Sequence, residues 1–307
     1  DVGPNPDSLP GYYGLLPGSW GHFARAWGVD VEWIKKQFAT PAMMEKPGIT
    51  VSRWIDAVLE KPENLDQETN VRAVVYWGHA PNSQNRGKEM VDAIKKLDLL
   101  VVIDPYPSAS AAMAAMARKD GVYLLQAATQ LECAGSVTAS NRSIQWREKV
   151  IEPMFEARTD HMIMYQLAQK FGIADQLVGK QADGKQKIKL VKGKGGMDEP
   201  DVEDILREIN RSVWTIGYTG HSPERLQAHM RNMHVFDVKT LRAKGGKDAK
   251  TGYVLDGDYF GLPWPCYGTP ELKHPGSPVL YNTSLPMMDG GGNFRANFGV
   301  ERDGVNL

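Results

Sequence analysis

Cysteine is scarce in this 307-residue sequence, and the scarcity excludes several kinds of site. The two cysteines, Cys133 and Cys266, are too few and too far apart for a structural zinc motif or an iron–sulfur motif. No apolar run is long enough to span a bilayer, so direct membrane insertion is not expected. The formal net charge of -1 leaves no surplus of basic residues, so no nucleic acid is expected as a partner.

The amino-terminal end lacks both an initiator methionine and a visible secretory signal, since it begins with Asp1-Val2-Gly3-Pro4. We therefore expect a processed chain or a piece of a longer one. The composition itself, 42% apolar and 24% charged, is that of a folded globular protein. The 31 glycines and 19 prolines predict long irregular segments, above all from residue 256 onward. A tail of this kind favours chain that wraps over a neighbouring surface.

Two short apolar runs, each followed by a polar loop, form the most informative pattern. The run over residues 73–77 opens into a loop over 78–84, and the run over 99–103 ends at Asp104. Apolar residues at helical spacing lie between them. Such a strand–helix–strand unit makes the two strands parallel, with both loops at the carboxyl edge, where open α/β sheets bind ligands.

The same alternation continues along the chain. A helix is predicted over residues 108–118 with Ser108 as its N-cap, and a third strand over 121–125. Another helix is predicted over 159–172 with Thr159 and Gly172 as its caps. Residues 126–153 show no clear periodicity. The Lys- and Gly-rich stretch over 179–196 is typical of an exposed hairpin or mobile insertion whose charges face solvent. These elements predict an α/β fold with an open, largely parallel sheet and flanking helices.

Several polar residues of the predicted loops could contact a ligand. Asp104 either accepts two hydrogen bonds from one ligand edge, such as ribose hydroxyls or guanine N–H groups, or begins a turn. Asn82 and Gln84 offer amides to a base or phosphate, or belong to an ordinary turn, and His79 is typical of a polar surface. Asp160, in a first helical turn, either complements the helix dipole or contacts a ligand. The pattern alone indicates a nucleotide-type site of unspecified chemistry.

Seven stretches carry a resemblance to a known family. They are residues 8–18 (SLPGYYGLLPG), 77–84 (WGHAPNSQ), 101–108 (VVIDPYPS), 137–148 (VTASNRSIQWRE), 150–153 (VIEP), 262–266 (LPWPC) and 298–307 (FGVERDGVNL). In content and order they resemble the catalytic α subunit of bacterial formate dehydrogenases of the sulfate-reducer type. Those enzymes carry W or Mo in a bis-molybdopterin guanine dinucleotide cofactor. Only the Lys- and Gly-rich insertion falls outside the resemblance.

The resemblance implies an activity and an assembly. The activity is reversible oxidation of formate to carbon dioxide, with electrons leaving through a [4Fe–4S] cluster to an iron–sulfur electron-transfer (beta) subunit, in the periplasm. In such enzymes the selenocysteine or cysteine metal ligand, the catalytic His and Arg, and the four cluster cysteines lie upstream of the part resembled here. The chain is therefore interpreted as a middle segment that is not catalytic alone and has the remaining segments of the subunit as partners.

The resemblance also implies a domain organisation. It gives a helical and loop lead-in over residues 1–70 and an α/β cofactor-binding domain over 71–235, with the exposed insertion near 179–196. An irregular linker over 236–307 leads toward a C-terminal barrel domain outside the chain.

Carried over residue by residue, the resemblance assigns contacts with a guanine dinucleotide arm to a loop, a strand end and a helix start. These contacts are Gly78, His79, Asn82 and Gln84, then Ile103 and Asp104, and finally Asp160. A Glu-led loop of the family falls on Glu132 and Cys133, where many relatives carry Lys after the Glu. That departure argues against Cys133 as a contact.

Three other interpretations stay open from the sequence. The chain could belong to a sister bis-pterin oxidoreductase, such as a nitrate or arsenate reductase. It could be a noncatalytic scaffold homologue that keeps the fold without the pterin, or a free-standing nucleotide-binding module. Substrate assays on the intact enzyme separate the sister enzymes, and metal and pterin analysis decides on the scaffold homologue. Folding of the isolated chain with affinity for guanine nucleotides would favour the free-standing module.

Overall fold

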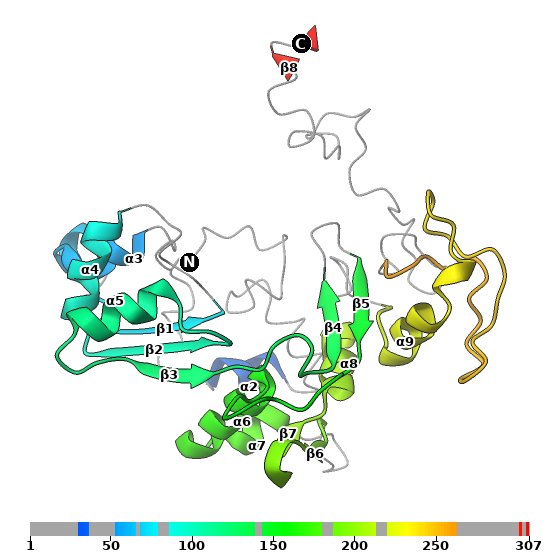
Figure 1. Cartoon of the computed structure of the whole chain (residues 1–307), viewed down its shortest axis with the longest axis horizontal. Coiled ribbons are helices and arrows are strands. Elements are labelled where there is room, and N and C mark those ends of the chain that lie inside the picture. The colour runs from blue at the N-terminus through cyan, green and yellow to red at the C-terminus, as the bar shows by residue number, and fades with distance from the viewer. Residues whose placement is uncertain are drawn as a thin grey trace. The chain divides into compact units, whose positions relative to one another are not determined.

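The computed structural model describes residues 30–36, 53–65, 68–78, 86–138, 143–179, 187–212, 220–262, 301–302 and 305–306 (Figure 1). The chain divides into two compact units, residues 1–134 with 148–204 and residues 135–147 with 205–307. The boundaries inferred from the resemblance, at residues 70 and 235, stay a prediction. None of the helices that the structure describes is both long and apolar enough to cross a membrane.

A three-stranded parallel sheet forms the centre of the first unit. Its strands lie in the order β1 (Ala73–Trp77), β2 (Leu99–Asp104) and β3 (Tyr123–Gln126). In register, Trp77 lies opposite Ile103, and Ile103 lies opposite Leu125. Helices α4 (Gly87–Lys96) and α5 (Ala109–Ala117) connect the strands. The predicted parallel α/β arrangement is confirmed.

Local sequence explains where these helices begin and end. The Ser108 hydroxyl accepts a hydrogen bond from the Ala111 N–H at 3.3 Å and caps α5. Helix α6 (Asp160–Phe171) begins after Thr159, whose hydroxyl accepts the Met162 N–H, and ends at Gly172 in the left-handed conformation. All three caps lie where the sequence predicts them.

The two faces of the sheet are covered by different helices. On one face, α3 (Trp54–Leu59), α4 and α5 pack around Tyr76, Leu100 and Val102 in a continuous buried cluster. On the opposite face, Ile163 of α6 packs on Ile103. Figure 1 shows α4 and α5 on one side of β1–β3 and α6 on the other. Helices on both faces are typical of a parallel sheet.

The predicted insertion contains a short antiparallel hairpin, which we call the β6–β7 hairpin (residues 190–200). Strand β6 (Leu190–Lys192) pairs with β7 (Asp198–Pro200) around the 3-10 turn η6 (Lys194–Gly196). Lys192 is exposed beside Asp198, as predicted for a solvated face. Lys194 differs, because its ammonium donates to the carbonyls of Met154, Phe155 and Ala157.

The remaining elements of the first unit are α2 (Val31–Lys36), η4 (Pro62–Asn64) and α7 (Ala174–Val178).

The second unit contains a hairpin that the sequence analysis missed. Strands β4 (Gly135–Thr138) and β5 (Ile144–Arg147) pair antiparallel within the stretch without clear periodicity. Ile144 and Trp146 are buried on either side of the exposed Gln145, an alternation too short to stand out. Other elements are α8 (Val202–Ser212), which crosses the unit boundary, α9 (Pro223–Arg231), η7 (Met233–Val235), β8 (Glu301–Arg302) and β9 (Val305–Asn306).

Candidate functional site

The carboxyl ends of the three parallel strands meet at one edge of the first unit's sheet. At this edge Gly78 follows β1 with φ +58°, and its N–H donates to the Ile103 carbonyl at 2.9 Å. None of the described residues has an atom within 4 Å of a Cβ built on Gly78, so none of them crowds its backbone. The predicted contacts His79, Asn82 and Gln84 follow in residues 79–85, which lie outside the described residues.

Asp104 ends β2 at the same edge and is half-buried. Its Oδ1 accepts the Tyr106 N–H at 3.1 Å, which is the turn geometry considered from the sequence. Its Oδ2 has no hydrogen-bond partner in the part of the chain that the structure describes. A cavity of about 290 Å³ opens beside it, lined by Val102, Asp104, Pro105, Tyr106, Pro107, Leu124, Leu125 and Gln126. The turn and a ligand contact are therefore compatible.

Asp160 is the first residue of α6 and is exposed at the same edge. Its Oδ1 accepts a hydrogen bond from the indole Nε1 of Trp77 at 2.5 Å. That bond fastens the first turn of α6 to the end of β1. Trp77 was not singled out from the sequence, although an amphipathic indole beside a polar loop is a usable signal.

Ile103 differs from the other predicted contacts because its side chain is fully buried. It packs against Ala127 and Ile163 under α6. Its carbonyl accepts the Gly78 N–H. Ile103 thus stabilises the edge through core packing and through its carbonyl. Its contact with the cofactor stays a prediction.

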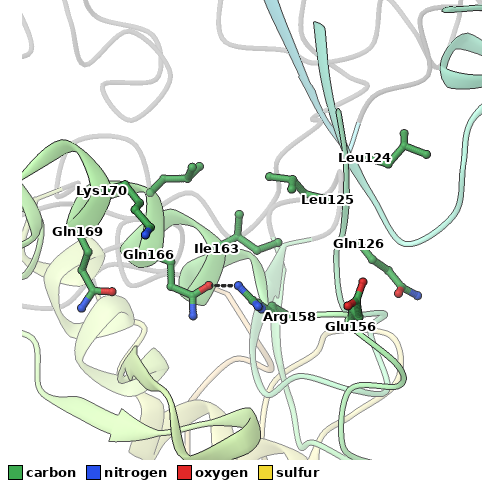
Figure 2. Close-up of a pocket in the computed structure, with 10 residues that line it drawn as sticks. Leu124, Leu125, Gln126, Glu156, Arg158, Ile163, Gln166, Gln169 and Lys170 are labelled. Atoms are coloured by element: carbon green, nitrogen blue, oxygen red, sulfur yellow. Dashed lines mark hydrogen bonds between the residues drawn. The ribbon is translucent and has the colours of Figure 1, made fainter. Parts of the chain in front are cut away.

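A larger cavity of about 540 Å³ lies between β3 and α6 (Figure 2). Both apolar and polar side chains line it, namely Leu124, Leu125, Gln126, Glu156, Arg158, Ile163, Gln166, Leu167, Gln169 and Lys170. Arg158 donates from its guanidinium to the Gln166 amide oxygen, the bond drawn in Figure 2.

Backbone pairing explains how Arg158 comes to lie beside this cavity. Its N–H donates to the Gln126 carbonyl at 3.1 Å, and its carbonyl accepts the Ala128 N–H at 2.8 Å. These bonds form a parallel bridge that extends the sheet by one residue beyond β3. Sequence reasoning missed Arg158, because one bridged residue leaves no periodic signal.

Glu132 shapes the loop that follows β3. The side chain is buried, and its carboxylate accepts the N–H groups of Thr129 and Met154, both at 2.6 Å. The bonds from Thr129 and then Met154 hold the pKa of Glu132 below its ordinary value. Cys133 donates its thiol to the Thr129 carbonyl at 3.3 Å. Cys133 therefore bonds within its own loop, whereas Glu132 joins that loop to the backbone at Met154.

Metal ligation has no candidate in the described ranges. Within residues 30–262, apart from the gaps given above, no group of three or more His, Cys, Asp or Glu side chains is arranged to hold a metal ion. The edge offers carboxylates, amides and open backbone, a donor set that suits an organic ligand.

Comparison with known proteins gives a family match over residues 18–170, to the family described as Molybdopterin oxidoreductase. The chain is 27% identical over 228 residues to the F420-dependent formate dehydrogenase subunit alpha of Methanocaldococcus jannaschii, covering 74% of this chain and 26% of that protein. Formate dehydrogenase H of Escherichia coli is 28% identical over 174 residues, 56% of this chain and 21% of that protein.

Dimethyl sulfoxide reductase DmsA of Escherichia coli is also similar, 27% identical over 158 residues, which is 45% of this chain and 19% of that protein. The matched segments thus span between 19% and 26% of the lengths of these three relatives. The described elements that build the edge, from β1 to the first turns of α6, all lie within residues 18–170.

Proposed function

We propose, on the premise that residues 18–170 belong to the molybdopterin oxidoreductase family, that the carboxyl edge of the sheet binds the guanine dinucleotide arm of a molybdopterin cofactor. The observation that carries the proposal is the pair of carboxylates at this edge, Asp104 and Asp160. Each has one oxygen engaged by the protein and Oδ2 without a partner among the described residues. Carboxylates placed in this way select ligands that present N–H or O–H donors.

The residues at the edge fit a guanine dinucleotide. The guanine edge presents N1–H and an amino group, and ribose presents hydroxyls, all of which a carboxylate accepts. No described residue crowds the backbone of Gly78, and a glycine without a Cβ lets a ligand approach closely. Gly78, Asp104 and Asp160 would hold this arm, with His79, Asn82 and Gln84 as proposed partners from the following loop.

When bound, the metal–pterin group supplies the two-electron redox chemistry. The contribution of this chain is to bind and orient it, since small displacements of a metal site change its reactivity. We infer that the reaction is the reversible oxidation of formate to carbon dioxide. The extent of similarity supports this choice, because the two formate dehydrogenases match 74% and 56% of the chain.

The rival reductases match less of the chain. Dimethyl sulfoxide reductase DmsA matches 45%, and the trimethylamine-N-oxide reductase of Vibrio cholerae matches 40%. The remaining parts of the proposal come from the sequence resemblance. They are W or Mo as the metal, a [4Fe–4S] cluster, an iron–sulfur partner subunit and a periplasmic location.

Substrate and cofactor analysis of the purified intact enzyme that contains this chain tests the proposal. We expect formate-dependent reduction of a viologen dye, and release of GMP on acid hydrolysis in proportion to bound W or Mo. Turnover of dimethyl sulfoxide, trimethylamine N-oxide or nitrate without formate oxidation would refute the formate assignment. Bound pterin without releasable GMP would refute the guanine dinucleotide.

A further inference from the structure

The β6–β7 hairpin packs on the segment that carries Asp160 and Arg158. It follows the segment that matches the family, since its residues 190–200 lie beyond residue 170. Three of its side chains, Lys194, Met197 and Glu199, reach back to residues 154–166. Glu199 contacts the N-cap of α6, Lys194 contacts the turn before α6, and Met197 contacts Gln166 within α6.

Glu199 holds the cap of α6. Its Oε2 accepts the Thr159 hydroxyl at 2.8 Å, and the His161 Nε2 lies 3.5 Å from the same oxygen. The Thr159 hydroxyl also accepts the Met162 N–H, so one carboxylate supports the whole first turn. Partial burial raises the pKa of Glu199, but the bonds from His161 and Thr159 outweigh it and lower the pKa below its ordinary value. Glu199 is therefore charged at neutral pH.

Lys194 holds the turn that precedes α6. Its ammonium donates to the carbonyls of Met154, Phe155 and Ala157. Phe155 has φ +47°, a left-handed conformation that costs a side-chain-bearing residue roughly 1 kcal/mol or more. A cation bound to three carbonyls favours this backbone over its relaxed alternatives.

Met197 completes the contact through Gln166. The Gln166 amide nitrogen donates to the Met197 sulfur at 3.2 Å, while the Gln166 amide oxygen accepts from Arg158. Gly193 lets the hairpin come this close, since a Cβ there would lie 2.5 Å from the Met162 methyl and 2.6 Å from Cδ of Glu199.

We propose that Glu199 and Lys194 are positioning residues of the candidate site. They fix the first turn of α6 and the turn before it, and so place Asp160 against Trp77 and Arg158 beside the cavity in Figure 2. That Asp160 then contacts a guanine dinucleotide rests on the proposed function. The placement itself depends only on the protein.

The Trp77 indole N–H reports this placement directly. In protein labelled with ¹⁵N-tryptophan, Trp77→Phe identifies the Trp77 signal among those of the eight tryptophans. Glu199→Ala and Lys194→Met should each move that signal upfield, as the bond to Asp160 lengthens. Glu199→Gln should keep it near the wild-type position, because its amide oxygen still accepts the Thr159 hydroxyl. Lys192→Ala is the matched control, since Lys192 is exposed on the same hairpin and, among the described residues, pairs with Asp198 alone.

Cofactor retention provides the second measurement. Glu199→Ala should lower GMP per protein about tenfold, a loss typical when a group that orients a ligand is removed. Glu199→Gln should restore it. An unchanged Trp77 signal in both Glu199→Ala and Lys194→Met would overturn the positioning role. A moved signal with unchanged GMP would support the positioning role and refute Asp160 as a guanine contact.

Discussion

The Trp77 indole nitrogen and the Asp160 carboxylate lie 2.5 Å apart, across 83 positions of sequence. The bond connects the end of β1 with the start of α6. It also occupies only one oxygen of a carboxylate that stands in the first turn of a helix, where its negative charge is favourable. Asp160 therefore holds the start of α6 against the end of β1 with one oxygen and can bind a ligand with the other.

Trp77→Phe tests the supporting role. The substitution keeps an aromatic ring in the cluster and removes the donor to Asp160. Because this hydrogen bond is exposed, we expect the free energy of unfolding to fall by only about 0.5–1 kcal/mol. Urea denaturation measures it. A loss of more than about 3 kcal/mol would mean that the indole matters through packing, since that range is typical of a core aromatic.

Asp104→Ala tests the binding role at the neighbouring strand. We expect the pterin content and the turnover to fall together, because the substitution removes acceptors without touching the reacting centre. Asp98→Ala is the control, since Asp98 precedes β2 at the opposite edge of the sheet and pairs with Arg72. Full pterin content with normal turnover in Asp104→Ala would refute the assigned role.

The strands, helices and caps that build the edge could be predicted from sequence because each has a local cause. Apolar runs predict β1 to β3, and Ser108 and Thr159 stand at helix starts with free N–H groups to bind. The bond between Trp77 and Asp160 and the bridge at Arg158 depend on chain brought together only by folding. No short window of sequence contains those pairs.

The contacts of the β6–β7 hairpin also could not be predicted from the local sequence. A Lys- and Gly-rich stretch predicts solvent exposure, and Lys192 follows that expectation. Lys194 stands two residues away with the same chemistry, yet it binds three carbonyls some forty positions back in the sequence. Those carbonyls belong to the turn around Phe155. Phe155 adopts a left-handed conformation that usually requires glycine, so the sequence gives no signal for this turn.

Removing the N-caps of α5 and α6 should destabilise the protein by different amounts, because only the cap of α6 is bonded to Glu199. Ser108→Ala should cost about 1 kcal/mol, the ordinary value for a lost N-cap. Thr159→Ala should cost more, about 2 kcal/mol, because Glu199 also loses a donor. Thr159→Ser should recover most of the loss, and the exposed Ser136 provides a neutral control as Ser136→Ala. Equal costs for Ser108→Ala and Thr159→Ala, measured by urea denaturation, would contradict the role given to Glu199.

Three glycines form a matched set for backbone strain. Gly78 and Gly261 have φ of +58° and +64°, but only Gly261 is crowded, with a built Cβ 2.5 Å from the Ile144 carbonyl oxygen. We expect Gly78→Ala to cost about 1 kcal/mol and Gly261→Ala about 2–4 kcal/mol. Gly87 stands at the start of α4, where no described residue would contact an added Cβ, so Gly87→Ala should stabilise by about 0.5–1 kcal/mol. Thermal unfolding of the three variants would refute this reasoning if Gly78→Ala were the most damaging.

The second unit should lose stability as the pH falls from neutral, because it buries two histidines beside Arg225 and Asp258. The Gly261 N–H donates to His229 Nδ1 at 3.0 Å, so Nδ1 is unprotonated and Nε2–H donates to Asp258 at 2.8 Å. His221 Nδ1 faces the Arg225 guanidinium at 3.3 Å. Burial is the main cause that lowers the pKa of both histidines below 6.5, and for His229 it outweighs the opposing bond to Asp258.

The sign of the pH effect follows from those directions. Below about pH 6.5 the unfolded chain binds protons at both positions while the folded unit does not, so stability is complete above that pH and decreases below it. Each histidine contributes a slope of about 1.4 kcal/mol per pH unit until its folded pKa is reached. We expect His221→Phe to reduce the slope measured by urea denaturation between pH 7.5 and 5.5, because the folded and unfolded states then no longer differ in proton binding at this position. A slope that His221→Phe does not alter would mean that this buried imidazole accepts a proton as readily in the folded protein as in water.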